Sequence, residues 1–187
     1  LQDFGAYVDG ARKTFDVPGI AVAIVKDGKV VLEQGFGLRE IGKPDPVDAR
    51  TLFAIASNTK AFTAAALQQL ADAGKLKMDD RVIDHLPWFR MSDPYVTHEM
   101  RIRDLLAHRS GLSLGAGDLL YWPPTSYSTK EVVERLARVP IKYGCLSGDA
   151  DDNILFAVAT LVIEQASGQS YADYVREHLF KPVGMDE

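Results

Sequence analysis

The sequence is poor in cysteine, since Cys145 is its only thiol. A single cysteine cannot form an internal disulfide, and it does not identify a redox compartment. A chain of 187 residues buries enough surface on folding to hold a core without disulfides. The four histidines are spaced in a way that fits no metal pattern, so we expect no metal site and no cofactor.

The chain also lacks an excess of positive charge and any long apolar run. Its formal net charge is -5 and no block of Lys or Arg stands out, which argues against nucleic acid as a partner. No apolar segment approaches the roughly 20 residues that cross a bilayer, and residues 1–15 lack the features of a signal peptide. We therefore expect no membrane span, while the sequence leaves periplasmic, secreted and cytoplasmic locations open.

What the chain does contain is the ordinary balance of a globular domain, with 47% hydrophobic and 25% charged residues. Residues 20–25 and 30–36 predict two antiparallel strands joined by a tight turn at 26–29. A short helix is expected before them, ending near residue 15. Further helices are predicted at 57–73, 80–86, 101–108, 129–138, 152–166 and 171–179, with a long loop at 110–128.

The predicted hairpin is conspicuous because a two-stranded sheet is only marginally stable and leaves its edges unpaired. No later segment supplies convincing partner strands. We therefore expect a missing C-terminal portion that is truncated, cleaved or supplied by another chain. The open edge also allows a homo-oligomer or strand exchange with a second copy.

Ser57 and Lys60 stand three residues apart at the predicted start of the long helix, so the hydroxyl and the amine can meet on one face. A serine hydroxyl becomes a good nucleophile when a neighbouring base takes its proton, and a lysine can be that base. The helix N-terminus adds N–H groups where an oxyanion would form, including that of Ser57. The pattern favours acyl transfer through a covalent acyl-serine.

A simpler interpretation of this pair stays open. Average composition produces a Ser-x-x-Lys about once by chance in a chain of this length, and Ser57 would then act only as a helix cap. The surrounding residues decide between the two interpretations.

Residues 53–63 (Phe-Ala-Ile-Ala-Ser-Asn-Thr-Lys-Ala-Phe-Thr) resemble the nucleophile segment of the class C β-lactamase and family VIII esterase group. Residues 70–80, 102–112 and 180–185 resemble further stretches of that group in the same order. The resemblance implies a penicillin-recognising serine hydrolase of the β-lactamase and penicillin-binding-protein type. It also implies catalytic roles for Ser57 as nucleophile, Lys60 as base and Asn153 as a ligand of substrate or lysine, with substrate contacts at Asn58 and Asp151.

Asp151 departs from that family, whose Tyr-x-Asn motif has a tyrosine two residues before the asparagine. Because residues 153–159 match the asparagine and its helix, Asp151 takes the place of this tyrosine. A carboxylate there would pair with Lys60, hold the amine protonated and make it a worse base. The acidic stretch 145–152 is also unlike the family. The candidates for a replacement tyrosine, whose more typical roles are in loops or packing, are Tyr121, Tyr127 and Tyr143.

Together these features predict an α+β fold of the β-lactamase/transpeptidase type, with a helical region packed on a small antiparallel sheet and incomplete at the C-terminus. We expect one domain over residues 1–187, with the hairpin at 20–36 and the helical region at 57–180. The predicted function is hydrolysis of a small-molecule ester, amide or β-lactam through an acyl-serine, impaired in this chain. The alternative is a catalytically inactive relative or fragment that serves as a binding or assembly module.

Overall fold

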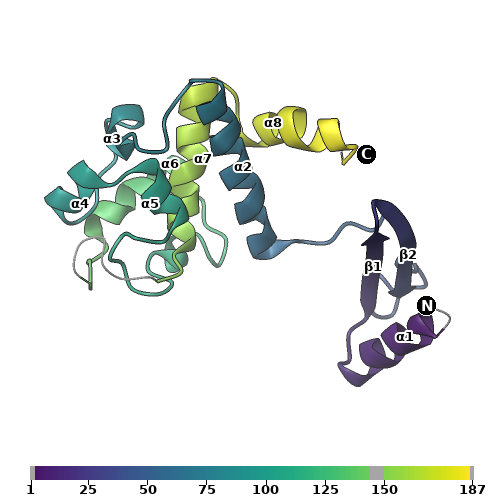
Figure 1. The fold of residues 1–187 in the computed structure, drawn as a ribbon. Helices are drawn as coiled ribbons and strands as arrows, with labels where there is room; N and C mark the ends of the chain where they lie inside the picture. The colour runs from purple at the N-terminus through teal and green to yellow at the C-terminus, as the bar shows by residue number, and fades with distance from the viewer. Residues whose placement is uncertain (1–2, 144–149, 186–187) are drawn as a thin grey trace. The chain divides into compact units, whose positions relative to one another are not determined.

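The computed structural model describes residues 3–143 and 150–185 and divides into two compact units, residues 1–55 and 56–187, which are described separately (Figure 1). Residues 145–149 of the acidic stretch lie outside the described residues. The helices and strands are α1 (Phe4–Thr14), β1 (Gly19–Lys26), β2 (Lys29–Gly37), α2 (Thr59–Asp72), α3 (Val82–His85), α4 (Pro94–Glu99), α5 (Ile102–Leu106), α6 (Thr129–Glu134), α7 (Asn153–Ser167) and α8 (Tyr171–Val175).

The first unit contains α1 and the β1–β2 hairpin. The strands pair antiparallel from Gly19 opposite Gly37 to Lys26 opposite Lys29, with one irregularity in the register. Asp27 and Gly28 form the turn with φ values of +51° and +71°, the left-handed geometry that suits a two-residue hairpin. The predicted hairpin is confirmed, and the sheet has two strands within the described residues.

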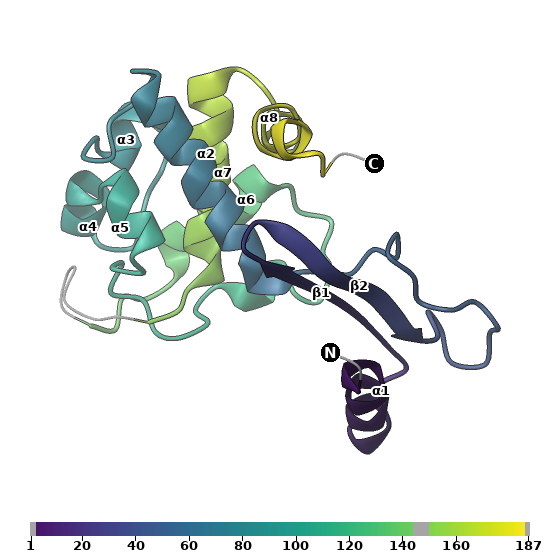
Figure 2. The same ribbon diagram turned by 45° about the vertical axis from the view of Figure 1, so that its right-hand side comes forward.

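The second unit is helical and is organised around α7. The apolar residues of α7 repeat at intervals of four and lie in two adjacent rows, so the helix is buried over a wide face. One face of α2 packs against it, and the two helices lie side by side in both views (Figures 1 and 2). The side chains of α7 that are fully buried are Ile154, Leu155, Val158, Ala159, Val162 and Ile163.

Four further helices of this unit contact α7, namely α3, α5, α6 and α8. Their apolar side chains form one core, in which the largest fully buried members include Leu67, Phe89, Met100, Ile102, Leu105, Leu112 and Leu136. The long loop at 110–128 is confirmed apart from one short 3₁₀ turn, Asp118–Leu120. This core holds the beginnings of α2 and α7 in fixed positions.

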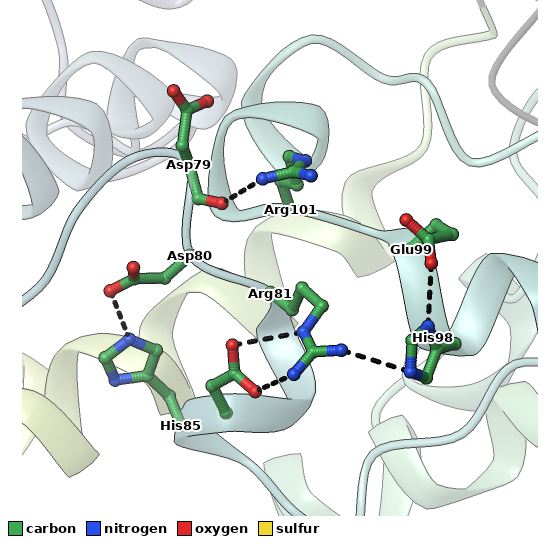
Figure 3. A network of polar contacts seen from close by, with 8 residues as sticks. Asp79, Asp80, Arg81, His85, His98, Glu99 and Arg101 are labelled. Atoms are coloured by element: carbon green, nitrogen blue, oxygen red, sulfur yellow. Dashed lines mark hydrogen bonds and ion pairs between the residues drawn. The ribbon is translucent and has the colours of Figure 1, made fainter.

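A polar network fastens the segment before α3 to α4 and α5 (Figure 3). Asp80 accepts a hydrogen bond from a ring nitrogen of His85 at 3.0 Å, and Arg81 forms an ion pair with Asp84 at 2.9 Å. Another nitrogen of Arg81 lies 3.0 Å from His98 Nε2. These two histidines therefore have structural partners, and no cluster of three or more His, Cys, Asp or Glu that could hold a metal occurs among residues 3–143 and 150–185.

The helical region and the small antiparallel sheet of the predicted α+β fold are both present. The sequence analysis missed α4, whose first residue is Pro94. Within α6 and the turn that follows it, Arg135 donates to the backbone oxygen of Glu131 at 2.6 Å. The Glu131 carboxylate instead accepts from Ser128, the residue that caps α6. Within the described chain, no helix has the length and apolar character to span a bilayer.

Candidate active site

Ser57 lies in a 3₁₀ turn, Ala56–Asn58, that leads directly into α2. Ala56 has φ of +44°, a left-handed conformation that costs a residue with a Cβ roughly 1 kcal/mol. Lys60 follows in the first turn of α2, and its Nζ donates to Ser57 Oγ at 3.0 Å. The hydroxyl and the amine are therefore within hydrogen-bonding distance. Their spacing of three residues in the sequence allows this contact.

Asn153 reaches the same amine from the first position of α7. Its Oδ1 accepts from Lys60 Nζ at 2.6 Å, across 93 positions of sequence. This contact exists because α2 and α7 pack side by side and both begin at this site. The structure thus brings together the three residues that the sequence analysis selected as catalytic.

Asp151 supplies a carboxylate to the other side of the amine. Its Oδ1 lies 3.5 Å from Lys60 Nζ and 3.5 Å from His108 Nε2. His108 Nδ1 accepts the backbone N–H of Asp152 at 3.1 Å, which places the proton of the neutral ring on Nε2, facing Asp151. The Asp151 side chain is 58% exposed, so solvent screens these pairs.

Asp118 and Tyr121 belong to the site but were not identified as a pair from the sequence. The Asp118 carboxylate accepts from the Tyr121 hydroxyl at 2.8 Å and from Asn153 Nδ2 at 3.2 Å. Burial, followed by the bond to Asp118, raises the pKa of the Tyr121 hydroxyl, which makes it a neutral donor and a poor substitute for a proton-relaying tyrosine. The sequence offers one signal for these two residues. Both lie in the same long loop, and long loops often carry functional residues.

A pocket of about 540 Å³ opens in front of the serine. Its walls combine aromatic and aliphatic side chains with four threonines, and Lys60 is the charged residue that lines it. Asn58 stands beside Ser57 in the turn, but neither Asn58 nor Asp151 is among the lining residues, so their contact with substrate stays a prediction. Of the three candidate tyrosines, Tyr143 does not line it. The aromatic lining residues are Tyr121, Tyr127, Phe156 and Tyr171.

Asp152 lies behind the site and is fully buried. Its Oδ2 accepts from Ser110 Oγ at 3.2 Å, while Oδ1 has no hydrogen-bond partner among residues 3–143 and 150–185. Burial raises the pKa of Asp152 to about 6, because removing a carboxylate from water disfavours its charged form. The Asp152 carboxyl therefore titrates closer to neutrality than an ordinary aspartate does.

Comparison with known proteins was made against families, sequences and solved structures. A family model described as Beta-lactamase matches residues 4–187. Penicillin-binding protein 4 of Amycolatopsis lactamdurans is 32% identical over 186 residues, which cover 96% of this chain and 46% of that protein. The chain spans 34% to 46% of the length of the curated relatives that it matches.

Two solved structures have a similar fold over nearly the whole chain. The octameric penicillin-binding protein homologue from Pyrococcus abyssi superposes with a TM-score of 0.80 at 27% identity, covering 99% of this chain and 43% of the other. D-amino acid amidase from Ochrobactrum anthropi SV3 superposes with a TM-score of 0.80 at 26% identity, covering 98% and 52%. The helical region with its small sheet therefore has the β-lactamase/transpeptidase fold.

Proposed function

We propose, since this chain belongs to the Beta-lactamase family, that it is a serine hydrolase acting on an ester, an amide or a β-lactam through an acyl-serine at Ser57. The observation that carries this proposal is the 3.0 Å contact between Lys60 Nζ and Ser57 Oγ. Asn153 holds the same amine from the opposite helix. A hydroxyl beside a positioned base at the mouth of a pocket is the arrangement that nucleophilic catalysis needs.

In the proposed reaction, Ser57 Oγ forms a bond to the carbonyl carbon while its proton passes to the neutral amine of Lys60. The backbone N–H of Ser57 stabilises the negative oxygen of the tetrahedral intermediate. The bond to the leaving group then breaks, and Lys60 gives the proton to the departing oxygen or nitrogen. Water releases the acyl group in a second step, in which Lys60 takes a proton from water and returns it to Ser57.

Asp151 limits the rate in this proposal. Its carboxylate lies 3.5 Å from Lys60 Nζ, so a Lys60 ammonium paired with it must release a proton before the amine can accept one from Ser57. A tyrosine at this position would offer a hydroxyl that can pass a proton onward, and a carboxylate with a charged partner does not. We therefore infer a slow enzyme.

The relatives support the breadth of the proposed substrate class. The names of the two structural neighbours refer to penicillin binding and to amidase activity. Acylation by a penicillin and hydrolysis of an amide both involve attack on an acyl carbon. The pocket walls select among such substrates more than the nucleophile does. The aromatic lining of this pocket favours an acyl donor with an apolar group.

Turnover of a p-nitrophenyl ester and of nitrocefin tests the proposal, with Ser57→Ala as the matched control. We expect turnover below about 1 s⁻¹, a low value for an enzyme, that disappears in the variant. Rates equal to those of Ser57→Ala with both substrates would contradict the hydrolase proposal.

The second candidate function is an inactive relative that serves as a binding or assembly module. The observation that favours it is the charged pair between Asp151 and Lys60. Such a module would bind a penicillin reversibly. A serine hydrolase would instead form an acyl-serine at Ser57 and gain the mass of the whole penicillin, with its β-lactam ring opened. Intact-protein mass spectrometry after incubation with penicillin distinguishes the two functions.

The open hairpin of the first unit is also proposed to pair with a second copy. Both strands carry exposed β-branched residues, of which Val25 is 64% and Val30 60% exposed. The sheet has two strands within the described residues, so each strand lacks a second partner strand there, and such edges favour association. Light scattering over a concentration series checks this, and a monomer at all concentrations would contradict it.

A further inference from the structure

The segment from Gly115 to Tyr121, in the loop before α6, is fastened to the beginning of α7. The N–H of Gly115 donates to the backbone oxygen of Asp151 at 3.1 Å. Gly117 has φ of +85°, and a Cβ added to it would lie 2.8 Å from Ile154 Cδ1, so the loop backbone approaches the helix closely. These contacts fix the loop relative to the first turn of α7.

From this loop, the half-buried Asp118 directs its carboxylate at Asn153. Its Oδ2 accepts from Asn153 Nδ2 at 3.2 Å, and its Oδ1 accepts from the Tyr121 hydroxyl at 2.8 Å. The carbonyl oxygen of the same Asn153 amide receives the Lys60 ammonium at 2.6 Å. A continuous series of hydrogen bonds therefore runs from Tyr121 through Asp118 and Asn153 to Lys60.

The chemistry of these groups makes the chain directional. A carboxylate only accepts hydrogen bonds and an ammonium only donates them. An asparagine between them satisfies both partners in one orientation, with its NH₂ toward the carboxylate and its oxygen toward the amine. The flipped amide would bring NH₂ against an ammonium and oxygen against a carboxylate, which is repulsive at both ends.

We propose that Asp118 is a positioning residue that fixes the amide of Asn153 so that its oxygen holds Lys60 against Ser57. Asp118 acts through Asn153 and does not touch the reacting atoms. This inference rests on the proposed function for its effect on rate, although the orientation of the amide is a property of the resting chain.

A double-mutant cycle measures whether Asp118 acts through Asn153. We expect Asp118→Ala to lower the rate at which a fluorophosphonate labels Ser57 by about tenfold, the loss of one charge-assisted hydrogen bond. In an Asn153→Ala background the same substitution should change the rate by less than about twofold. Asp118→Asn, which keeps an acceptor oxygen, should recover part of the rate and guards against a folding defect. Equal losses in both backgrounds would overturn the inference.

Asp72→Ala is the matched control for this cycle. Asp72 also accepts a side-chain amide, that of Gln68 at 2.7 Å, but it lies at the far end of α2 on an exposed surface. Its removal should leave labelling of Ser57 unchanged. A tenfold loss in this variant would mean that removing any such carboxylate slows labelling, and the inference would fail.

An NMR measurement tests the orientation of the Asn153 side-chain amide and does not require the protein to be catalytically active. The side-chain NH₂ signal of Asn153, identified by its loss in Asn153→Ala, should shift toward that of a solvated amide in Asp118→Ala and stay in place in Asp72→Ala. An unchanged Asn153 signal in Asp118→Ala would overturn the inference. If the wild-type chain is not labelled at all, the proposed function fails, and the amide signal still decides the role of Asp118.

Discussion

Asp151 is the residue at which the resemblance predicts a departure from the family pattern, with a carboxylate in the expected place of a tyrosine. It contacts Lys60 and His108 with a single oxygen. The sequence allowed this contact to be predicted, since the position follows from the spacing to Asn153. The participation of His108 could not be predicted, because a left-handed turn at φ of +54° aims its ring back at the site.

We predict that Asp151→Tyr accelerates ester hydrolysis by about 10-fold to 100-fold, the lower part of what a positioned acid or base contributes. The hydroxyl would take the place of the carboxylate beside Lys60. Steady-state kinetics with a p-nitrophenyl ester measures the change. Asp151→Asn serves as the control, because it removes the charge without adding a phenol, and an equal gain in that variant would show that charge alone limits the rate.

Asp152 should stabilise the folded chain as the pH falls, which is the opposite of the effect of an aspartate whose pKa is lowered on folding. Burial raises the pKa of its carboxyl to about 6 from an ordinary 3.8, so the folded chain holds this proton more tightly than the unfolded chain. Lowering the pH from 7 through about 6 therefore adds stability from this group, and raising the pH removes it. Near pH 7 the cost is fully present and amounts to about 3 kcal/mol.

Urea unfolding at pH 5 and pH 7 checks this prediction. Several other carboxylates, including Asp80 and Glu131, have a pKa lowered by hydrogen bonds, and their contributions are lost only at more acidic pH. We expect the wild-type chain to gain stability at pH 5 relative to Asp152→Asn. The same pH dependence in both proteins would show that Asp152 is not responsible.

At the scale of elements, the sequence predicts most helices because their apolar residues recur at the helical period. The helix α4 was missed because a proline inside a sequence is typical of a break between helices. In the structure Pro94 is the first residue of α4, where a missing N–H has no cost, and Asp93 caps the helix. The pair Asp93-Pro94 is a start signal that could have identified it.

We predict that Asp93→Ala lowers the free energy of unfolding by about 1 kcal/mol, the usual value of an N-cap. The Asp93 carboxylate accepts the N–H groups of Tyr95 and Val96 at 2.7 and 3.1 Å, and both donors would lose this partner. Chemical denaturation measures the change. Asp45→Ala, at an exposed position outside any helix, should have almost no effect, and equal losses in the two variants would contradict the capping role.

At the scale of the whole molecule, the catalytic residues come together because two helices far apart in sequence begin at the same place. Ser57 and Lys60 could be paired from local spacing alone. The contact of Asn153 with Lys60 was expected only through the resemblance to a family, since helical periodicity does not say which helices become neighbours. Asp118 depends on how a long loop folds over α7, which local sequence patterns do not determine.

The two units should respond differently to loss of an aliphatic side chain. Ile163 is fully buried in α7, whereas Val25 on β1 is 64% exposed. We predict that Ile163→Ala costs 2 to 5 kcal/mol, roughly the range for a buried aliphatic residue, and that Val25→Ala costs less than about 0.5 kcal/mol. Denaturation measures both, and a large loss for Val25→Ala would mean that the hairpin surface is covered in solution.

The most direct test of the account is covalent labelling of Ser57 by a fluorophosphonate, followed by intact mass measurement and peptide mapping. We expect one adduct on Ser57, no adduct in Ser57→Ala, and labelling at least about tenfold slower in Lys60→Met than in Lys75→Met, a lysine beyond the other end of α2. Labelling at other residues, or equal rates in the two lysine variants, would contradict the claim that Lys60 activates Ser57.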